Sequence, residues 1–219
     1  MKQKVLMAMS GGVDSSTAAL LLQEAGYDVI GVTLKMFENK AIGLTGETDS
    51  SFANVRDAKQ VAEKMGFPHY VFDFCPYFRQ FVIDHFIAEY ESGRTPNPCV
   101  DCNKNVKLGQ LFPKAEELGC DYIATGHYAN VKFNEETGRW LLLRGDDRQK
   151  DQSYMLYTLT QNQLAHIPFP LFPGWPSSAD VPAETEYGPA VLASGCTAYS
   201  SGPFACHLPA AAASVRFLH

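Results

Sequence analysis

Apolar residues run along this chain in short unbroken blocks, separated by segments of helical periodicity. The first block, residues 5–9, has no polar alternation, which is typical of a strand buried on both faces. Residues 17–26 place Ala and Leu at helical spacing and end in a glycine, so they predict a helix. Further apolar blocks at residues 27–34, 69–74 and 120–125 predict three more strands.

Helical periodicity recurs between these strands, at residues 52–65, 77–90 and 106–119. Strands that alternate with helices predict parallel strands joined by helical crossovers. The sequence therefore predicts an α/β fold with a doubly wound, mostly parallel sheet. Residues 131–133 and 140–143 predict a hairpin, and the polar, irregular residues 35–51 predict a loop over the site.

Two glycines, an aspartate and three serines separate the first strand from its helix, in the segment SGGVDSS that begins at Ser10. Glycine lets backbone amides approach an anion closely, and the N-terminus of the following helix adds about half a positive charge. The segment therefore predicts a phosphate-binding turn; the alternative is an ordinary tight turn with a serine cap. It has neither the lysine of a P-loop nor the GxGxxG pattern of a dinucleotide-binding turn.

The composition narrows the class of protein. The 219 residues suffice for one substantial domain and an appendage, and we expect a cytoplasmic protein without membrane association, because no apolar run reaches membrane-spanning length. The net charge of −6 argues weakly against a dedicated nucleic-acid binder, although an enzyme can hold RNA with one face and be acidic overall. Six scattered cysteines do not predict a disulfide scaffold.

Two of these cysteines, Cys99 and Cys102, lie within GRTPNPCVDCNKNVK at residues 93–107. Prolines, glycine and asparagines exclude a regular element until about Asn105, so we expect both thiols on a constrained loop before a helix. The helix N-terminus and the nearby lysines would lower a thiol pKa from about 8.5. Half a zinc site would need a second ligand pair, and a thioredoxin-like site would follow the first strand; a catalytic thiol is the third alternative.

The SGGVDSS segment resembles the pyrophosphate loop of the PP-loop ATP pyrophosphatases, which split ATP between its α and β phosphates. The resemblance implies ATP, with Mg²⁺ bound to it, as the ligand, and no metal site made by side chains. In that family the main chain at the end of the second strand holds adenine, although Leu34 could instead be plain core. The implied ATP contacts are Ala8, Met9, Ser10, Gly11, Gly12, Val13, Asp14, Ser15, Leu34 and Gly126.

Together with this loop, the pattern GRTPNPxxxCNxxxK looks like the signature of the tRNA-specific 2-thiouridylases, the MnmA/TrmU family. These enzymes convert the wobble uridine of tRNA to 2-thiouridine. The resemblance implies that Cys102 is a catalytic thiol and that Asn97, Pro98 and Cys99 contact the target base. It also implies tRNA contacts for His127, in the turn GHYA, and for Lys150, Asp151 and Gln152 in KDQ. Without the resemblance, His127 is a satisfied loop histidine and KDQ a polar helix start.

The resemblance implies a tRNA-uridine 2-sulfurtransferase that adenylates the uridine and then transfers sulfur from a cysteine persulfide. Its partners would be tRNA and a persulfide sulfur donor protein. The resemblance ends near Leu171, and the neighbours of Cys196 do not match the family's second cysteine segment. We therefore expect an incomplete catalytic domain at residues 1–167. Residues 168–219, rich in Pro, Ala and Ser, are expected to form a poorly structured tail from a shifted frame or truncated gene.

Two other functions remain open from the sequence. One is a different PP-loop ligase or synthetase that acts on a small molecule, against which GRTPNP and KDQSY argue. The other is an inactive nucleotide-binding fragment, because the persulfide-carrying cysteine is not recognisable.

Overall fold

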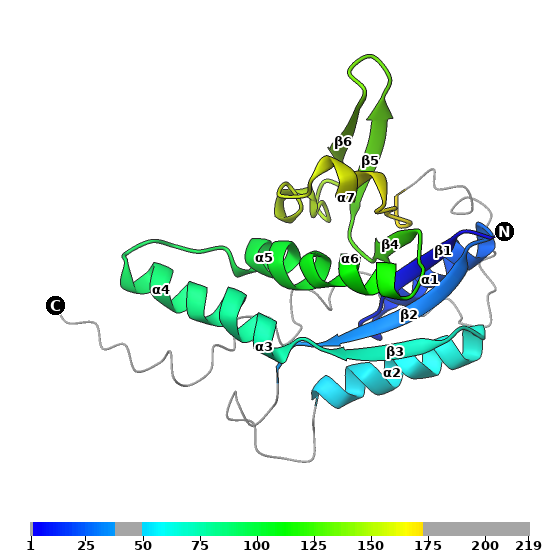
Figure 1. The fold of residues 1–219 in the computed structure, drawn as a ribbon, viewed down its shortest axis with the longest axis horizontal. Helices are drawn as coiled ribbons and strands as arrows, with labels where there is room; N and C mark the ends of the chain where they lie inside the picture. The colour runs from blue at the N-terminus through cyan, green and yellow to red at the C-terminus, as the bar shows by residue number, and fades with distance from the viewer. Residues whose placement is uncertain (1, 38–49, 173–219) are drawn as a thin grey trace.

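The computed structural model describes residues 2–37 and 50–172, and it is built around a parallel four-stranded sheet (Figure 1). The order is β3-β2-β1-β4, and all three strand pairings are parallel. The strands are β1 (Lys4–Ala8), β2 (Asp28–Lys35), β3 (His69–Asp73) and β4 (Tyr122–Thr125). These bounds lie within two residues of the predicted ones, so the predicted parallel α/β sheet is confirmed.

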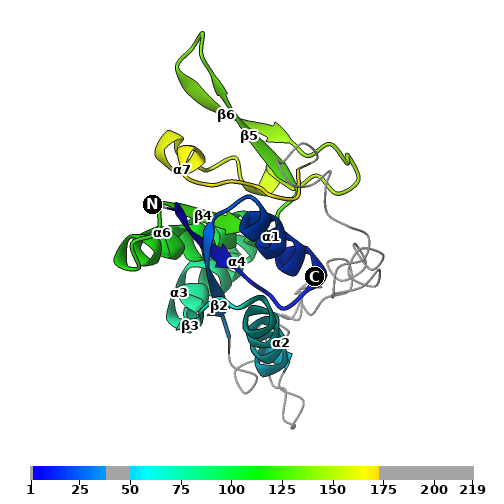
Figure 2. The ribbon, with the colours of Figure 1, turned by 90° about the vertical axis from the view of Figure 1, so that its right-hand side faces the viewer.

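Helices cover both faces of the sheet (Figure 2). On one face, α1 (Val13–Glu24) and α2 (Ser50–Met65) pack with Val5 and Met7. On the other face, Leu6 packs with residues of α6 (Leu108–Glu117). Successive residues of β1 thus enter opposite cores, which explains why this strand has no polar alternation.

Helix α1 begins at Val13, four residues before the predicted start at Thr17. Gly12, with φ −84° and ψ 169°, is its N-cap residue, so VDSS forms the first turn. Polar residues fill that turn, and the apolar periodicity that marks a helix in sequence begins only at Ala18. The two glycines therefore lie directly at the helix N-terminus, as a phosphate-binding turn requires.

The predicted loop around the cysteines is wrong, because a helix begins at Pro98. It runs as α5 (Pro98–Asp101), the π-helical segment η3 (Cys102–Lys107) and α6. Asn97 is the N-cap and accepts a hydrogen bond from the Cys99 amide, while Pro98 occupies a position that needs no donor. Pro113 lies inside α6 without ending it.

The helix predicted at 77–90 is present as three consecutive segments: α3 (Cys75–Phe78), the π-helical η2 (Arg79–Asp84) and α4 (His85–Glu91). The predicted hairpin consists of β5 (Ala129–Asn134) and β6 (Arg139–Arg144), which pair antiparallel. It is followed by the short helices η4 (Ser153–Met155) and α7 (Gln161–Ala165).

The last described residues return to the sheet. Ile167 is 1% exposed and Phe169 is 2% exposed, and both pack in the core that covers one face of the sheet. Phe169 therefore belongs to this core although it lies beyond residue 167, the predicted end of the catalytic domain. Most of the predicted loop (residues 38–49) and of the predicted tail (residues 173–219) lies outside the described residues. Within the described part, no helix is both long enough and apolar enough to span a bilayer.

Candidate functional site

The four parallel strands end at one edge of the sheet, and side chains fix the segments that follow them. The Met9 amide donates to the Val32 carbonyl at 2.8 Å, and Thr33 Oγ1 donates to the Met9 carbonyl at 3.0 Å. The Thr33 oxygen in turn accepts from His69 Nε2 at 2.8 Å, because its only proton is already committed. Burial lowers the pKa of His69, which favours the neutral ring. The start of the glycine loop is thus bonded to β2 and, through Thr33, linked to β3.

The serines of the glycine loop hold it in its turn. Ser15 Oγ donates to the Gly12 carbonyl at 3.0 Å and accepts from the Ser10 amide at 3.2 Å. Ser16 Oγ donates to the same carbonyl at 2.9 Å. Ser15 and Ser16 are buried, whereas Ser10 is exposed at the rim of the loop. The turn is preorganised, with an exposed hydroxyl at the helix N-terminus.

Two glycines in this region lie close against neighbouring backbone, and at Gly11 the φ angle also requires glycine. Gly11 has φ +77°, and a Cβ there would lie 2.8 Å from the Asn54 carbonyl oxygen of α2. A Cβ on Gly126 would lie 3.1 Å from the Ser15 amide nitrogen. Gly126 therefore packs directly on the first turn of α1, which brings the two predicted glycine turns together.

The main chain of Leu34 faces the glycine loop. Val32 accepts from Met9 on the β1 side of β2, whereas Gly31 donates to Pro68 on the β3 side. Because the direction of backbone hydrogen bonding repeats every second residue in a strand, the amide and carbonyl of Leu34 point to the β1 side. The pairing of β1 with β2 ends at Val32, so Leu34 lies beyond the end of β1. This is the position expected of an adenine contact, although the Leu34 side chain packs against the core.

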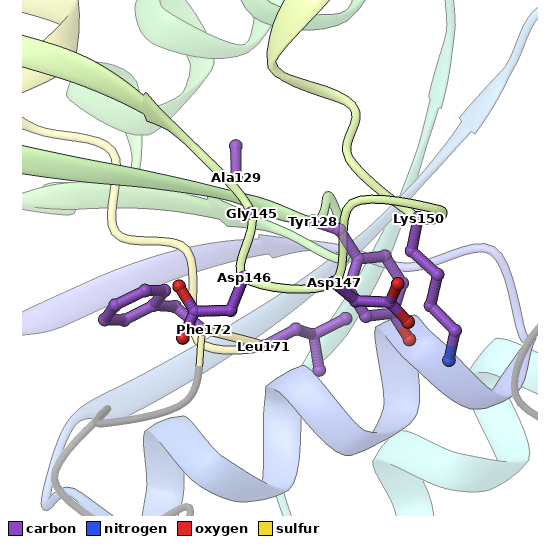
Figure 3. A pocket seen from close by; sticks show the side chains of 8 residues that line it. All are labelled: Tyr128, Ala129, Gly145, Asp146, Asp147, Lys150, Leu171 and Phe172. Carbon is purple, nitrogen blue, oxygen red and sulfur yellow. The ribbon is translucent and has the colours of Figure 1, made fainter.

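Tyr128, which the sequence did not single out, joins the glycine loop to the segment after the hairpin. Its hydroxyl donates to Asp14 Oδ1 at 2.7 Å, and Lys150 Nζ lies 5.2 Å from the centre of its ring. Tyr128 and Lys150 line a cavity of about 140 Å³ (Figure 3). The other residues that line it are Ala129, Gly145, Asp146, Asp147, Leu171 and Phe172. The sequence signal that could have identified Tyr128 is its place in GHYA, two residues after Gly126.

The two cysteines differ sharply in exposure. Cys99 is exposed, whereas Cys102 is 8% exposed and its Sγ lies 3.9 Å from Sδ of Met36. Met36 is the residue after β2, so the Cys102 thiol lies at the same sheet edge as the glycine loop. Burial raises the pKa of Cys102, with Lys107 opposing that effect, so the expected lowering of this pKa is wrong.

Asparagines position the helical turn that carries these cysteines. Asn97 Oδ1 caps the helix at the Cys99 amide, and Asn103 Nδ2 donates to the Cys99 carbonyl at 2.9 Å. Asn103 is 3% exposed, and no described residue bonds to its Oδ1. The side chain of Asn97 is therefore engaged in holding the turn that presents Cys99.

His127 lies in the interior. It is 5% exposed, its Nδ1 lies 2.7 Å from Thr125 Oγ1, and burial lowers its pKa to about 3. An imidazole in this position does not reach the surface, which is at odds with the direct tRNA contact expected for it. The geometry matches the alternative, a neutral histidine satisfied by its neighbours.

The KDQ segment is held by its own side chains. Asp151 accepts from the Gly145 amide at 2.9 Å, and its pKa is lowered because such hydrogen bonds outweigh desolvation. Gln152 Oε1 accepts from the Tyr128 amide at 3.1 Å. Lys150 is half-buried against Tyr128. Asp151 and Gln152 are thus engaged in fixing the backbone on which Lys150 lies.

The structure gives no support to a zinc site. Among residues 2–37 and 50–172, no three His, Cys, Asp or Glu side chains are grouped so as to hold a metal ion. Cys99 and Cys102 lie on one helix, and His127 is engaged with Thr125.

Alkylation should distinguish the two thiols. At pH 8 we expect iodoacetamide to modify Cys99 about tenfold faster than Cys102, because burial blocks access and disfavours the thiolate. Lys107→Ala should slow the reaction of Cys102 further, since it removes the cation that lowers its pKa. Peptide mass spectrometry measures both rates, and Lys104→Ala is the control. Equal rates at the two thiols would contradict the buried position of Cys102.

The buried His127 should make stability depend on pH. The unfolded histidine binds a proton below about pH 6.5, whereas the folded one does so only near 3. The contribution of neutral His127 to the free energy of unfolding is therefore complete above about pH 6.5 and is lost as the pH falls. At pH 5.5 the loss is about 1.4 kcal/mol. Urea unfolding at pH 7.5 and 5.5 measures it; His127→Gln should reduce the difference by about 1.4 kcal/mol, and His166→Gln, at an exposed site, should leave it unchanged. An unchanged difference in His127→Gln would contradict the assignment.

Comparison with known proteins assigns this chain to a family. The family profile described as "tRNA methyl transferase HUP domain" matches residues 3–174. The tRNA-specific 2-thiouridylase MnmA of Clostridioides difficile is 50% identical over 171 residues, which are 78% of this chain and 47% of that protein. The MnmA of Moorella thermoacetica is 56% identical over 167 residues, which are 76% of this chain and 47% of that protein.

The chain thus spans about half the length of the curated relatives that it matches. A solved structure described as a predicted subunit of tRNA methyltransferase from Methanocaldococcus jannaschii has a TM-score of 0.46 and 21% identity, covering 78% of this chain and 69% of that one. The family match includes the glycine loop, both cysteines and the KDQ segment. The chain therefore belongs to the tRNA methyl transferase HUP-domain family and is a relative of the MnmA 2-thiouridylases.

Proposed function

We propose that this protein takes part in the ATP-dependent 2-thiolation of the wobble uridine of tRNA, and that its described residues bind ATP and supply Cys102 for the sulfur transfer. The observation that carries the proposal is the identity of half or more with 2-thiouridylases across a match that includes the glycine loop and both cysteines. The common sheet edge of Cys102 and that loop supports it.

ATP would bind along the carboxyl edge of the sheet. Its phosphates would lie at Ser10–Ser15, where backbone amides and the α1 N-terminus favour an anion, with Ala8 and Met9 leading into the turn. Adenine would lie beside the main chain of Leu34, and Gly126 would close the site from β4. Mg²⁺ would arrive with the nucleotide, with Asp14 beside it, and would stabilise charge on the departing pyrophosphate.

The reaction has two steps. The uridine oxygen on carbon 2 attacks the α-phosphorus, the bond to the β-phosphate breaks, and the base loses its N3 proton as pyrophosphate departs. The terminal sulfur of a persulfide then attacks carbon 2 and AMP leaves with the oxygen. Cys102 attacks the inner sulfur of that persulfide and forms a disulfide, which an external thiol reduces before the next cycle.

For this step the thiol of Cys102 must reach the inner sulfur of the persulfide that is joined to the base. Its burial and raised pKa describe a thiol that is protected before RNA binds. Displacement of Met36 by the incoming base would expose the sulfur, and Lys107 would favour its thiolate. Asn97, Pro98 and Cys99 would contact the base at the start of the same helix, and Lys150 would contact the RNA backbone with Asp151 and Gln152 supporting it. A direct contact from His127 would require the ring to move outward.

A thiolation assay tests the proposal. The full chain is mixed with unmodified tRNA, Mg²⁺ and ATP, and a persulfide donor protein is added; the nucleosides are then measured by mass spectrometry. The proposal predicts 2-thiouridine that depends on ATP. ATP cleavage that depends on a small molecule and is indifferent to tRNA would favour the ligase alternative, and nucleotide binding without any cleavage would favour the inactive fragment. The proposed partner that supplies sulfur is a persulfide donor protein, and the proposed location of the reaction is the cytoplasm.

A further inference from the structure

Tyr128 contacts two functional segments that are far apart in the sequence. Its hydroxyl lies 2.7 Å from Asp14 Oδ1, across 114 positions of the chain. Its main-chain amide donates to Gln152 Oε1 at 3.1 Å, and its carbonyl accepts from the Gln152 amide at 2.9 Å. Lys150 Nζ lies 5.2 Å from the centre of its ring, and Figure 3 shows the two side chains next to each other. One residue therefore contacts the glycine loop and the KDQ segment together.

These contacts constrain the position of both segments. A hydrogen bond to a carboxylate is short and directional, so the hydroxyl fixes the orientation of the Asp14 side chain and thereby of its second oxygen. The two hydrogen bonds to the main chain of Tyr128 fix Gln152, and Gly145 packs closely on the carbonyl of Tyr128, from which a Cβ at Gly145 would lie 3.1 Å. Tyr128 is half-buried between these partners. A shift of the Asp14 side chain must therefore either move the Tyr128 ring, and Lys150 with it, or break the hydrogen bond between Asp14 and Tyr128.

We infer that Tyr128 is a positioning residue that couples nucleotide binding at Asp14 to the placement of the Lys150–Gln152 segment. The inference rests on the proposed function, since it needs a nucleotide at the glycine loop. Magnesium-bound phosphates beside Asp14 set the orientation of its carboxylate, and the Tyr128 hydroxyl follows. Because Lys150 contacts the ring of Tyr128, the RNA-facing segment is ordered when ATP is bound. By thermodynamic reciprocity, RNA on that segment tightens ATP binding.

Hydrogen exchange tests this coupling without RNA. The full chain is measured with Mg²⁺ in the presence and absence of saturating α,β-methylene-ATP, and exchange is followed in the peptide that contains residues 145–153. The wild type should show exchange slowed by about fivefold or more on nucleotide addition. Tyr128→Phe keeps the ring and the backbone bonds but removes the hydroxyl, so most of this response should disappear. Tyr70→Phe, at an exposed tyrosine of β3, should respond like the wild type.

An equal response in Tyr128→Phe and the wild type would overturn the inference, and so would a wild type that binds nucleotide without any change in this peptide. If Tyr128→Phe does not fold, Asp14→Asn weakens the same hydrogen bond from the other side and should also reduce the response at saturating nucleotide. A wild type that fails to bind nucleotide overturns the inference and the proposed function together. A coupled response without 2-thiouridine formation supports the inference and counts against the proposed function alone.

Discussion

Cys102→Ser is expected to reduce 2-thiouridine formation by about 10³-fold or more, because the serine hydroxyl cannot attack a persulfide as a thiolate does. The same variant should retain tRNA-dependent release of pyrophosphate, since uridine adenylation does not use the thiol. The measurement pairs nucleoside mass spectrometry with a pyrophosphate assay on one reaction mixture. The two activities should separate completely in this variant.

Cys120→Ser is the matched control. Cys120 lies two residues before β4, at the opposite edge of the sheet from the glycine loop, and its amide donates to the Ala115 carbonyl. Both variants replace sulfur by oxygen in a partly or fully buried thiol. Cys120→Ser should therefore keep both activities. Thiolation that persists at the wild-type rate in Cys102→Ser would remove this residue from the reaction.

Gly11→Ala is the second substitution with a large expected effect. The Cβ would lie 2.8 Å from the Asn54 carbonyl and 3.0 Å from the Ala58 amide, both backbone groups of α2 that cannot move aside cheaply. Left-handed strain and overpacking together should cost about 3 kcal/mol of unfolding free energy. Relief of the overlap would shift the loop and lower ATP affinity by about 10²-fold. Urea unfolding and calorimetric titration with ATP measure the two effects.

Gly138→Ala separates the overlap from the backbone strain. Gly138 has φ +64°, like Gly11, but it lies in the open hairpin turn, where a Cβ would meet no described residue within 4 Å beyond its chain neighbours. It should lose only about 1 kcal/mol of stability and bind ATP normally. Comparable losses in the two variants would show that the contact between the glycine loop and α2 is unimportant.

The sequence was sufficient for the sheet and its edge, because buried parallel strands are apolar blocks and glycine turns are conspicuous. Helix starts were harder. The first turn of α1 is polar, so periodicity missed it, and Pro98 reads as a helix breaker although it occupies a first-turn position. A proline near a helix start is ambiguous until the cap at Asn97 is seen.

Side-chain environments could not be derived from local sequence. The thiol of Cys102 lies in the core and contacts Met36, which is 66 positions earlier in the chain, and the burial of the thiol reverses the expected direction of its pKa. Tyr128 is hydrogen-bonded to Asp14 and Gln152, which are distant in sequence. Such properties depend on tertiary contacts, which motifs do not specify.

Exchange of labelled pyrophosphate into ATP tests most directly whether this chain activates a tRNA base. The full chain is incubated with Mg²⁺, ATP and transcripts of one tRNA that differ only in carrying uridine or cytidine at the wobble position. The account predicts exchange with the uridine transcript and at most background exchange with the cytidine transcript or without RNA. Equal exchange in all three mixtures, or none with the uridine transcript, would contradict it.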